Sequence, residues 1–499
     1  MDGTPDDNFA LSSIFSQSYF QIPDYQRDYA WEKRNVKDLL DDVEFVYEQN
    51  SRDDRDSTLD HYFGTLVFED RGSIEPTDYE DYNIFGIVDG QQRLASIAIV
   101  ISAIVDEMAS LESDPDVDND FRSTVREERK KIRESYIQYK DIERIRLGGL
   151  AEEAYDNVII GDVSPDDFLE KDNLVEAERK IARAKQVSID RLQEWRKSRF
   201  ETDGLDHAAY YKFLNNLIQI LTQRFEVNVK VVEDIDEAAR MFKVINDRGR
   251  DLRLHDKIRS HLVYCASQSP TLNSKDIYTQ FNKIVRNITI HDGFSDSEVD
   301  DLTRIHWEVF TSERSDSRSK RPGPSDIHRR LSEFDDFANV QRSDIESFIQ
   351  PYLNSLETFS EYYPYLTDRD KPHEDPEASI NESVRRIQLL FLHPSVQSAT
   401  APLLIATADK FGVDSDEFAD ITSELEKLVF GFSLVMSHGA QGYKNTLSSI
   451  ANDLYWSDID ASDIEKIFNS DNQRYAGYQY KEVGIQKSID RVMRKRRKK

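Results

Sequence analysis

A short stretch around Asp89-Gly90 places the strongest constraint on how this chain folds. An apolar run rich in aromatic and β-branched residues, 82–88, comes directly before it. After it, apolar residues recur with helical spacing from Leu94 to Met108. Because Asp-Gly pairs are typical of turns, the sequence predicts a strand, a tight turn and a helix in direct succession.

The predicted turn is a candidate site for a phosphate group. The first turn of a helix presents unpaired backbone N–H groups and a partial positive charge. Gly90 would let a ligand approach the backbone closely, and the guanidinium of Arg93 could hold a phosphate through two hydrogen bonds. Asp89 could hold a metal ion or a water molecule. The alternative is an ordinary strand-to-helix corner, in which Asp89 caps the helix and Arg93 is solvated.

Charge limits the partners that this chain can bind. The 499 residues include 95 Asp+Glu and 65 Lys+Arg, for a net charge of -30, and the acidic residues are spread along the whole chain. Such a surface resembles that of halophilic proteins, and strong salt would screen its repulsion of nucleic acid. DNA binding therefore requires a local basic patch. A candidate DNA-binding cluster stands near the C-terminus, although it could also be a solvated helix end: Arg494, Lys495, Arg496 and Arg497.

The only cysteine, Cys265, excludes an internal disulfide and a multi-cysteine zinc site, which fits a reducing cytosol. The first residues show no basic segment followed by an apolar one, so no signal peptide is expected. No apolar run is judged to approach the roughly 20 residues that span a bilayer, and the most apolar candidate, 428–436, is too short. We therefore expect a soluble, cytoplasmic protein with no membrane partner.

Several further elements are predicted in the N-terminal half. The pattern indicates strands at 19–23, 62–69 and 225–232, a helix at 36–47, and an acidic loop at 70–81. Between the first strand and the first helix, aromatic side chains flank Arg27, where they could stack a base and hold a phosphate or form a packed loop. Residues 107–210 are interpreted as a helical insertion, with long polar helices at 127–139 and 176–200 whose charges mostly face solvent.

A second polar cluster follows the strand at 225–232. A predicted helix at 236–245 ends near Gly249, a residue suited to a helix C-terminus, and another helix runs from about 255 to 267. Asn246, Arg248 and Asp256 form the cluster, unless they only cap these helices. Beyond residue 267 we find no strand, and helices are predicted at 277–288, 299–311, 345–363, 384–391, 401–411 and 417–436.

Four segments in this order resemble the N-terminal domain family of GmrSD-type restriction endonucleases. They are 20–31 (FQIPDYQRDYAW), 62–64 (YFG), 87–94 (IVDGQQRL) and 242–252 (FKVINDRGRDL). The resemblance covers roughly residues 12–267. It implies an α+β fold, with a ParB/sulfiredoxin-like domain at 1–267 that carries the helical insertion, followed by an all-α domain at 268–499.

The resemblance also implies a site that binds and hydrolyses a nucleoside triphosphate with Mg²⁺; GTP, UTP and CTP are all possible. Carried over to this sequence, the catalytic residues are Asp89, Gln91, Gln92 and Arg93, the Mg²⁺ ligand is Asp89, and the nucleotide-binding residues are Tyr25, Gln26, Arg27, Gly90, Asn246, Arg248 and Gly249. Arginines would stabilise phosphate charge, and a glutamine would orient water. The chain has Leu94-Ala95-Ser96 where the family usually has Leu-Thr-Thr.

The coupled activity of the family is restriction of foreign DNA that carries modifications. Longer members often end in an HNH nuclease, but His393 and His438 lack the spacing and context of its motif, and no Walker-type glycine loop is present. We therefore expect an NTP-hydrolysing sensor in anti-phage defence that acts with a separate nuclease, as a possible homo-oligomer. The alternatives are a non-hydrolysing ParB-like DNA-binding or regulatory protein, and a fragment of a split restriction enzyme.

Overall fold

The computed structural model separates into two compact units, Met1–Leu252 and Arg253–Lys499. The boundary predicted after residue 267 lies one helix further along the chain. The structure describes residues 8–16, 18–22, 26, 28–51, 58–77, 80–201, 204–232, 253–267, 269, 271–291, 293–311, 327, 342–367, 394–429 and 441–456. Unit 1 is α/β and unit 2 is helical over these residues, which confirms the predicted fold class.

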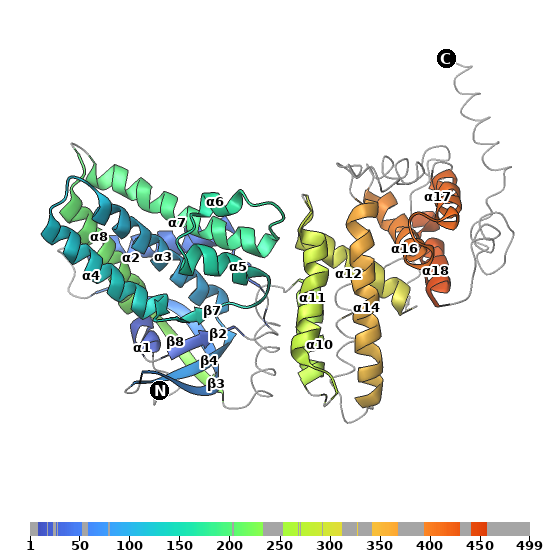
Figure 1. The fold of residues 1–499 in the computed structure, drawn as a ribbon, viewed down its shortest axis with the longest axis horizontal. Coiled ribbons are helices and arrows are strands. Elements are labelled where there is room, and N and C mark those ends of the chain that lie inside the picture. Colours follow the sequence, from blue (N-terminus) through green and yellow to red (C-terminus); the bar gives the residue numbers. More distant parts are fainter. Residues whose placement is uncertain are drawn as a thin grey trace, which may run out of the picture. The chain divides into compact units, whose positions relative to one another are not determined.

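Unit 1 is built on a six-stranded mixed sheet with helices gathered on one side of it (Figure 1). Its strands are β1(Asn8–Ala10), β2(Ser18–Gln21), β3(His61–Thr77), β4(Glu80–Asp89), β7(Ile145–Arg146) and β8(Phe225–Val232), and a small second sheet pairs β5(Gln138–Tyr139) with β6(Ile142–Glu143). Its helical elements are α1(Leu11–Phe15), α2(Lys33–Asn50), α3(Gln91–Ser113), α4(Asn119–Tyr136), η1(Gly149–Ala151), α5(Glu152–Ala154), η2(Tyr155–Ile160), α6(Pro165–Leu169), α7(Glu176–Phe200), α8(His207–Gln219) and η3(Ile220–Arg224).

The strand order is β1-β8-β3-β4-β2-β7. Strands β2 and β4 are parallel, so both end at the same edge of the sheet. Strand β3 runs antiparallel to β4 and therefore begins at that edge. The sheet thus brings three of the motif segments together, since 20–31 follows β2, 62–64 begins β3 and 87–94 ends β4.

Helix α3 is the centre of the core of unit 1. Of its 23 residues, 17 are buried, and it packs against α4, α7 and α8. By length and composition α3 is apolar enough to cross a membrane, and it is the one such helix among the described residues. The prediction that no apolar run approaches this length was therefore wrong. The charged residues Asp106 and Glu107 interrupt the run, but its mean hydropathy stays as high as that of a membrane span. Since 83% of its apolar window is buried, α3 has the character of a core helix.

The insertion at 107–210 is part of this core. Its strand β7 extends the main sheet next to β2, and α7 covers both α3 and α2. Lys185 on α7 is 2% exposed, donates to the carbonyl of Val158 at 2.6 Å and pairs with Asp106 at 2.7 Å. The prediction that the charges of the insertion mostly face solvent does not hold for Glu178, Lys180 and Lys185 of this helix, which are at most 6% exposed. The ammonium groups of Lys180 and Lys185 reach the more exposed carboxylates of Glu32 and Asp106.

Residues 70–77 and 80–81 form strand rather than the predicted acidic loop. Strand β3 continues to Thr77, and β4 begins at Glu80, so the two strands form a long antiparallel pair. Beyond Glu69, β4 is the one strand that pairs with β3 among the described residues. Pairing with an already ordered strand overrides the low strand propensity of its acidic residues.

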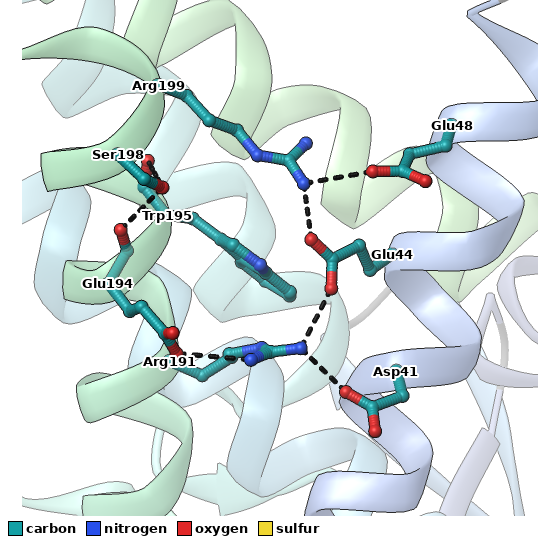
Figure 2. Close-up of polar contacts among 8 residues, drawn as sticks. All are labelled: Asp41, Glu44, Glu48, Arg191, Glu194, Trp195, Ser198 and Arg199. Atoms are coloured by element: carbon teal, nitrogen blue, oxygen red, sulfur yellow. Dashed lines mark hydrogen bonds and ion pairs between the residues drawn. The ribbon is translucent and has the colours of Figure 1, made fainter.

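An ion-pair network joins α2 to α7 (Figure 2). Glu44 on α2 accepts from both Arg191 and Arg199 on α7, with 2.8 Å between Glu44 Oε2 and Arg191 Nη2. Arg191 also reaches Asp41, and Arg199 reaches Glu48. The Glu44, Arg191 and Arg199 side chains are 22–28% exposed, so solvent screens these contacts less than those of a surface pair.

Replacing Glu44 with glutamine is expected to lower the free energy of unfolding by about 1–3 kcal/mol, because one carboxylate serves two partly buried guanidinium groups. Urea unfolding in low and high KCl would measure the change. The control is Asp38→Asn on the same helix, since Asp38 is 63% exposed and its partner Arg34 is 90% exposed. Equal stabilities of the two variants would show that the network is not stabilising.

Unit 2 contains only helices among its described residues: α10(Leu254–Ser267), α11(Ser274–Thr289), α12(Asp296–Phe310), α14(Arg342–Thr367), α16(Pro394–Phe411), α17(Asp416–Val429) and α18(Gln441–Trp456). Helix α14 packs against α11 and α16, and α18 packs against α16 and α12. The predicted helices at 277–288, 299–311, 345–363 and 401–411 match these elements. The prediction at 417–436 is met as far as Val429, and the one at 384–391 lies outside the described residues.

Candidate phosphate-binding site

The turn between β4 and α3 has the geometry that its sequence predicts. Gly90 has φ +96° and stands at the N-terminal end of α3. A Cβ atom at Gly90 would lie 2.2 Å from Cδ2 of Leu66, so this position requires glycine for space as well as for its backbone conformation. No side chain among the described residues caps α3, and the alternative in which Asp89 caps the helix is therefore not observed.

Arg93 is held beside the helix start by two neighbours. Its Nη2 atom donates to Asp89 Oδ2 at 3.0 Å, and its Nη1 atom donates to the carbonyl oxygen of Phe63 at 3.2 Å. The Arg93 and Asp89 side chains are 24% and 30% exposed, so both can still meet a ligand. The arginine is thus positioned by the fold, and the alternative of a freely solvated Arg93 is not observed.

Gly64 provides the space for the Arg93 side chain. Its φ is +105°, and a Cβ atom there would lie only 2.1 Å from Nη1 of Arg93. The register of β3 shifts between Tyr62 and Gly64, which marks a bulge at this strand end. Gly64 was not among the predicted site residues, although a glycine within an apolar strand often marks a close approach of another group.

Gln92 ties the segment after β2 to the same site. Its Oε1 atom accepts from the backbone N–H of Ala30 at 2.7 Å, and its Nε2 atom donates to the carbonyl of Asp28 at 3.0 Å. Gln92 is 8% exposed. Because both ends of its amide bind backbone, Gln92 fixes the path of residues 28–30.

Two more contacts join this segment to β4 and α3. Gln26, which is buried, donates through Nε2 to the carbonyl of Val88 at 2.7 Å. The hydroxyl of Tyr29 lies 2.7 Å from Oγ of Ser96. Burial raises the pKa of Tyr29 well above its usual range, although the hydrogen bond to Ser96 opposes the shift. The serine of Leu94-Ala95-Ser96 therefore keeps a hydroxyl where the family usually has threonine.

Asp28 connects the insertion to the site. Its Oδ1 atom accepts from the backbone N–H of Leu150 at 2.9 Å. Leu150 follows Gly149, which has φ +78°, in the part of the insertion between α4 and α7. Neither Asp28 nor Ser96 was among the candidate residues, because sequence gives no signal for contacts between segments this far apart.

The remaining candidates divide into two groups. Gln91 is 5% exposed in the first turn of α3. Asp256 lies in α10 of unit 2, where it accepts from Arg259 Nη2 at 3.0 Å. The other candidates lie outside the described residues: Tyr25, Arg27, Asn246, Arg248, Gly249, Arg494, Lys495, Arg496 and Arg497.

The side chains at this turn suit a magnesium ion that binds together with a phosphate ligand. Asp89 is the carboxylate nearest to the helix start, and no group of three or more His, Cys, Asp or Glu side chains that could hold a metal is found in the described part of the chain. Mg²⁺ is usually bound through one or two carboxylates together with substrate phosphates and water. The residues present therefore fit Mg²⁺ in a phosphate complex rather than in an all-protein cage.

A helix N-terminus, a positioned Asp-Arg pair and the carboxyl ends of two parallel strands meet at one edge of the sheet, so unit 1 is an α/β domain with a candidate anion-binding edge. The comparison with protein families identifies it further. The model of the family described as GmrSD restriction endonuclease, N-terminal domain, matches residues 11–263, which is just over half of the 499 residues, and the chain belongs to this family. No curated protein matches the sequence. The domain is that of a component of a DNA restriction system.

Proposed function

We propose that this chain binds a nucleoside triphosphate and Mg²⁺ at the edge formed by β2, β4 and the start of α3, and hydrolyses it. The observation that carries the proposal is Arg93, which lies beside the N-terminus of α3, with its Nη2 atom 3.0 Å from Oδ2 of Asp89. This arrangement places fixed positive charge next to a carboxylate that can take a cation. Phosphoryl transfer requires little more than such positioning and charge stabilisation.

The roles of the residues follow from their contacts. A phosphate oxygen would replace Asp89 as the partner of Arg93, and Asp89 would then be available to hold Mg²⁺. Phe63 keeps the guanidinium in place during this exchange, because its carbonyl accepts from the other nitrogen. Since Gln92 is engaged with backbone at both ends, we assign the orientation of the attacking water to Gln91 and a positioning role to Gln92.

Within a restriction system, the chain would act as the sensor that couples nucleotide hydrolysis to recognition of modified DNA. Its partner would be a separately encoded nuclease. A second candidate function is a switch that binds nucleotide without hydrolysing it. The Asp89–Arg93 ion pair supports this candidate as well, since the binding of a phosphate to Arg93 would by itself break the pair and change the site. Whether nucleotide is consumed decides between the two.

Phosphate release from GTP, UTP, CTP and ATP, with Mg²⁺ and high KCl, tests the proposal. The wild-type chain is expected to hydrolyse at least one of them. Arg93→Ala is expected to reduce the rate constant by a factor of about 10²–10³, the usual effect of removing one preorganised hydrogen-bond donor to the transition state. Asp89→Asn should also lower the rate. The variants should remain folded, because losing the contacts of one partly buried charged group costs about 1–3 kcal/mol, less than the roughly 5–15 kcal/mol by which domains are usually stable.

Three outcomes are informative. If Asp89→Asn and Arg93→Ala release phosphate at the wild-type rate, this turn is not the active site. Binding without release by the wild-type chain supports the switch instead. If the wild-type chain neither binds nor hydrolyses any of the four nucleotides, the proposed function is wrong.

A further inference from the structure

Residues 149–160 of the insertion form a continuous helical stretch that contacts the candidate site. The stretch consists of η1, α5 and η2, each of which packs against α7. Its last part, η2, is a π-helix, and the N–H of Gly161 donates to the carbonyl of Asp156, five residues earlier, at 2.8 Å. Because π-helical turns are rare and occur frequently at functional sites, this part of the insertion is a candidate for a functional role.

The C-terminal end of the stretch is anchored within unit 1. The carbonyls of its last three residues accept hydrogen bonds from side chains of α7, α3 and α4. The donors are Lys185, Ser102 and Arg133, and the acceptors, in the same order, are Val158, Ile159 and Ile160. These contacts satisfy carbonyls that the end of a helix leaves unpaired, so this end is fixed to the core.

The N-terminal end of the stretch is held by the candidate site. Gly148 and Ala151, which precede η1 and α5, provide no side-chain hydrogen bond to the helix start. The carboxylate of Asp28 provides one, because its Oδ1 atom accepts from the N–H of Leu150 at 2.9 Å, and negative charge is favourable at a helix N-terminus. The carbonyl of Asp28 accepts from Gln92 in the first turn of α3 at 3.0 Å. Asp28 therefore contacts both elements.

We propose that Asp28 couples the nucleotide site to residues 149–160, so that nucleotide binding stabilises the start of this stretch and the stretch in turn sets the affinity for nucleotide. The inference rests on the proposed function and adds regulation to it. A ligand held by Arg93 lies beside segment 28–30, which Gln92 fixes to the same helical turn. Such coupling is reciprocal, so a partner that stabilises the stretch tightens nucleotide binding by the same factor.

Hydrogen exchange with and without nucleotide tests the coupling. The full-length chain would be measured alone and with saturating GTP, UTP, CTP or ATP and Mg²⁺, after isothermal titration has given the Kd of each. In the wild type, bound nucleotide is expected to slow exchange of the amides of 151–154 about fivefold or more, the lower end of usual coupling. Asp28→Ala should lose this slowing and raise the Kd by the same factor. Asp28→Asn should retain the slowing, because an amide oxygen can still accept from Leu150.

Leu150→Pro removes the same hydrogen bond from its donor side. Proline has no N–H and is tolerated in the first turn of a helix. This variant should also lose the slowing, and it tests the coupling if Asp28→Ala does not fold. The control Glu153→Ala removes a 57% exposed side chain from α5 and should leave both the slowing and the Kd unchanged.

Three results overturn the coupling while the proposed function stands. The first is nucleotide binding by the wild-type chain without slower exchange of 151–154. The second is slowing that persists in Asp28→Ala or Leu150→Pro. The third is an equal loss of slowing in Glu153→Ala, because the effect would then not depend on the contact of Asp28. Failure of the wild-type chain to bind any of the four nucleotides overturns the proposed function itself, and the inference with it.

Discussion

Replacing Gly64 with alanine is expected to lower nucleotide turnover about 100-fold, close to the effect of removing Arg93 itself. The alanine Cβ would lie 2.1 Å from Nη1 and 3.3 Å from Cζ of Arg93, so the guanidinium must move. That movement breaks the hydrogen bond from Arg93 to the carbonyl of Phe63 and changes the direction from which the charge meets a phosphate. Steady-state phosphate release with saturating nucleotide and Mg²⁺ would measure the change.

The chain contains a matched control on the same strand. Gly72 of β3 also has a positive φ, +89°, but no atom lies within 4 Å of a Cβ built on it. Gly72→Ala therefore carries the backbone strain of about 1–2 kcal/mol without displacing a side chain. We expect it to lose some stability and to keep its turnover. Equal turnover by the two variants would show that the position of Arg93 does not matter for the reaction.

Replacing Asp300 with asparagine is expected to destabilise unit 2 by about 3–5 kcal/mol, because it removes one partner of a buried ion pair. Oδ1 of Asp300 accepts from the backbone N–H of His255 at 2.9 Å and lies 2.7 Å from its Nδ1 atom. The residues His255 and Asp300 are buried, with exposed fractions of 4% and 8%. Asparagine has nearly the same volume, so the change isolates the charge.

The effect should depend on pH. Burial alone would lower the pKa of His255, but the carboxylates of Asp256 and Asp300 outweigh it and the net shift of the pKa is upward. A histidine whose pKa is raised on folding adds stability below its unfolded pKa of about 6.5, and this stability is lost as the pH rises through the folded pKa. Wild-type unit 2 should therefore weaken above neutral pH, and Asp300→Asn should flatten this dependence.

Hydrogen exchange of α10 and α12 would report on unit 2 alone, which matters because a chain with two units need not unfold in one step. Asp301→Asn is the control, since Asp301 is 58% exposed and pairs with Arg304 on the helix surface. Its stability should stay within about 0.5 kcal/mol of wild type. If the two variants exchange alike at pH 6 and pH 9, the buried pair does not stabilise α10 against α12.

The fold was predictable where local pattern and tertiary structure agree. Alternating β-branched residues predict β8, and helical spacing after Gly90 predicts α3, because both patterns match the faces that these elements bury. The prediction of a loop failed at 70–77 and 80–81, where pairing between two long strands outweighs acidic composition. It also failed for Lys180 and Lys185 on α7, because a polar sequence does not reveal which lysine stem is buried by packing.

The residues of the candidate site also fall into those that local sequence predicts and those that only the fold reveals. That Asp89, Gly90 and Arg93 lie together at a helix start could be predicted because they are neighbours in sequence. The role of Gly64 required knowing that β3 begins beside α3, and the roles of Asp28 and Ser96 required the path of the segment after β2. For Gln92, the residue type suggested catalysis, but no sequence pattern indicates that both ends of its amide bind the backbone of residues 28–30.

The long apolar helix α3 has a consequence for the synthesis of this chain. The helices α7 and α8 that cover it end at Phe200 and Gln219, whereas α3 ends at Ser113. At typical rates of translation, about 5 to 20 s pass before a ribosome has made this covering. During that interval the nascent chain carries a segment as apolar as a membrane span without its covering helices, so we expect it to need a chaperone at the ribosome exit. Truncated chains that stop before residue 219 are expected to aggregate for the same reason.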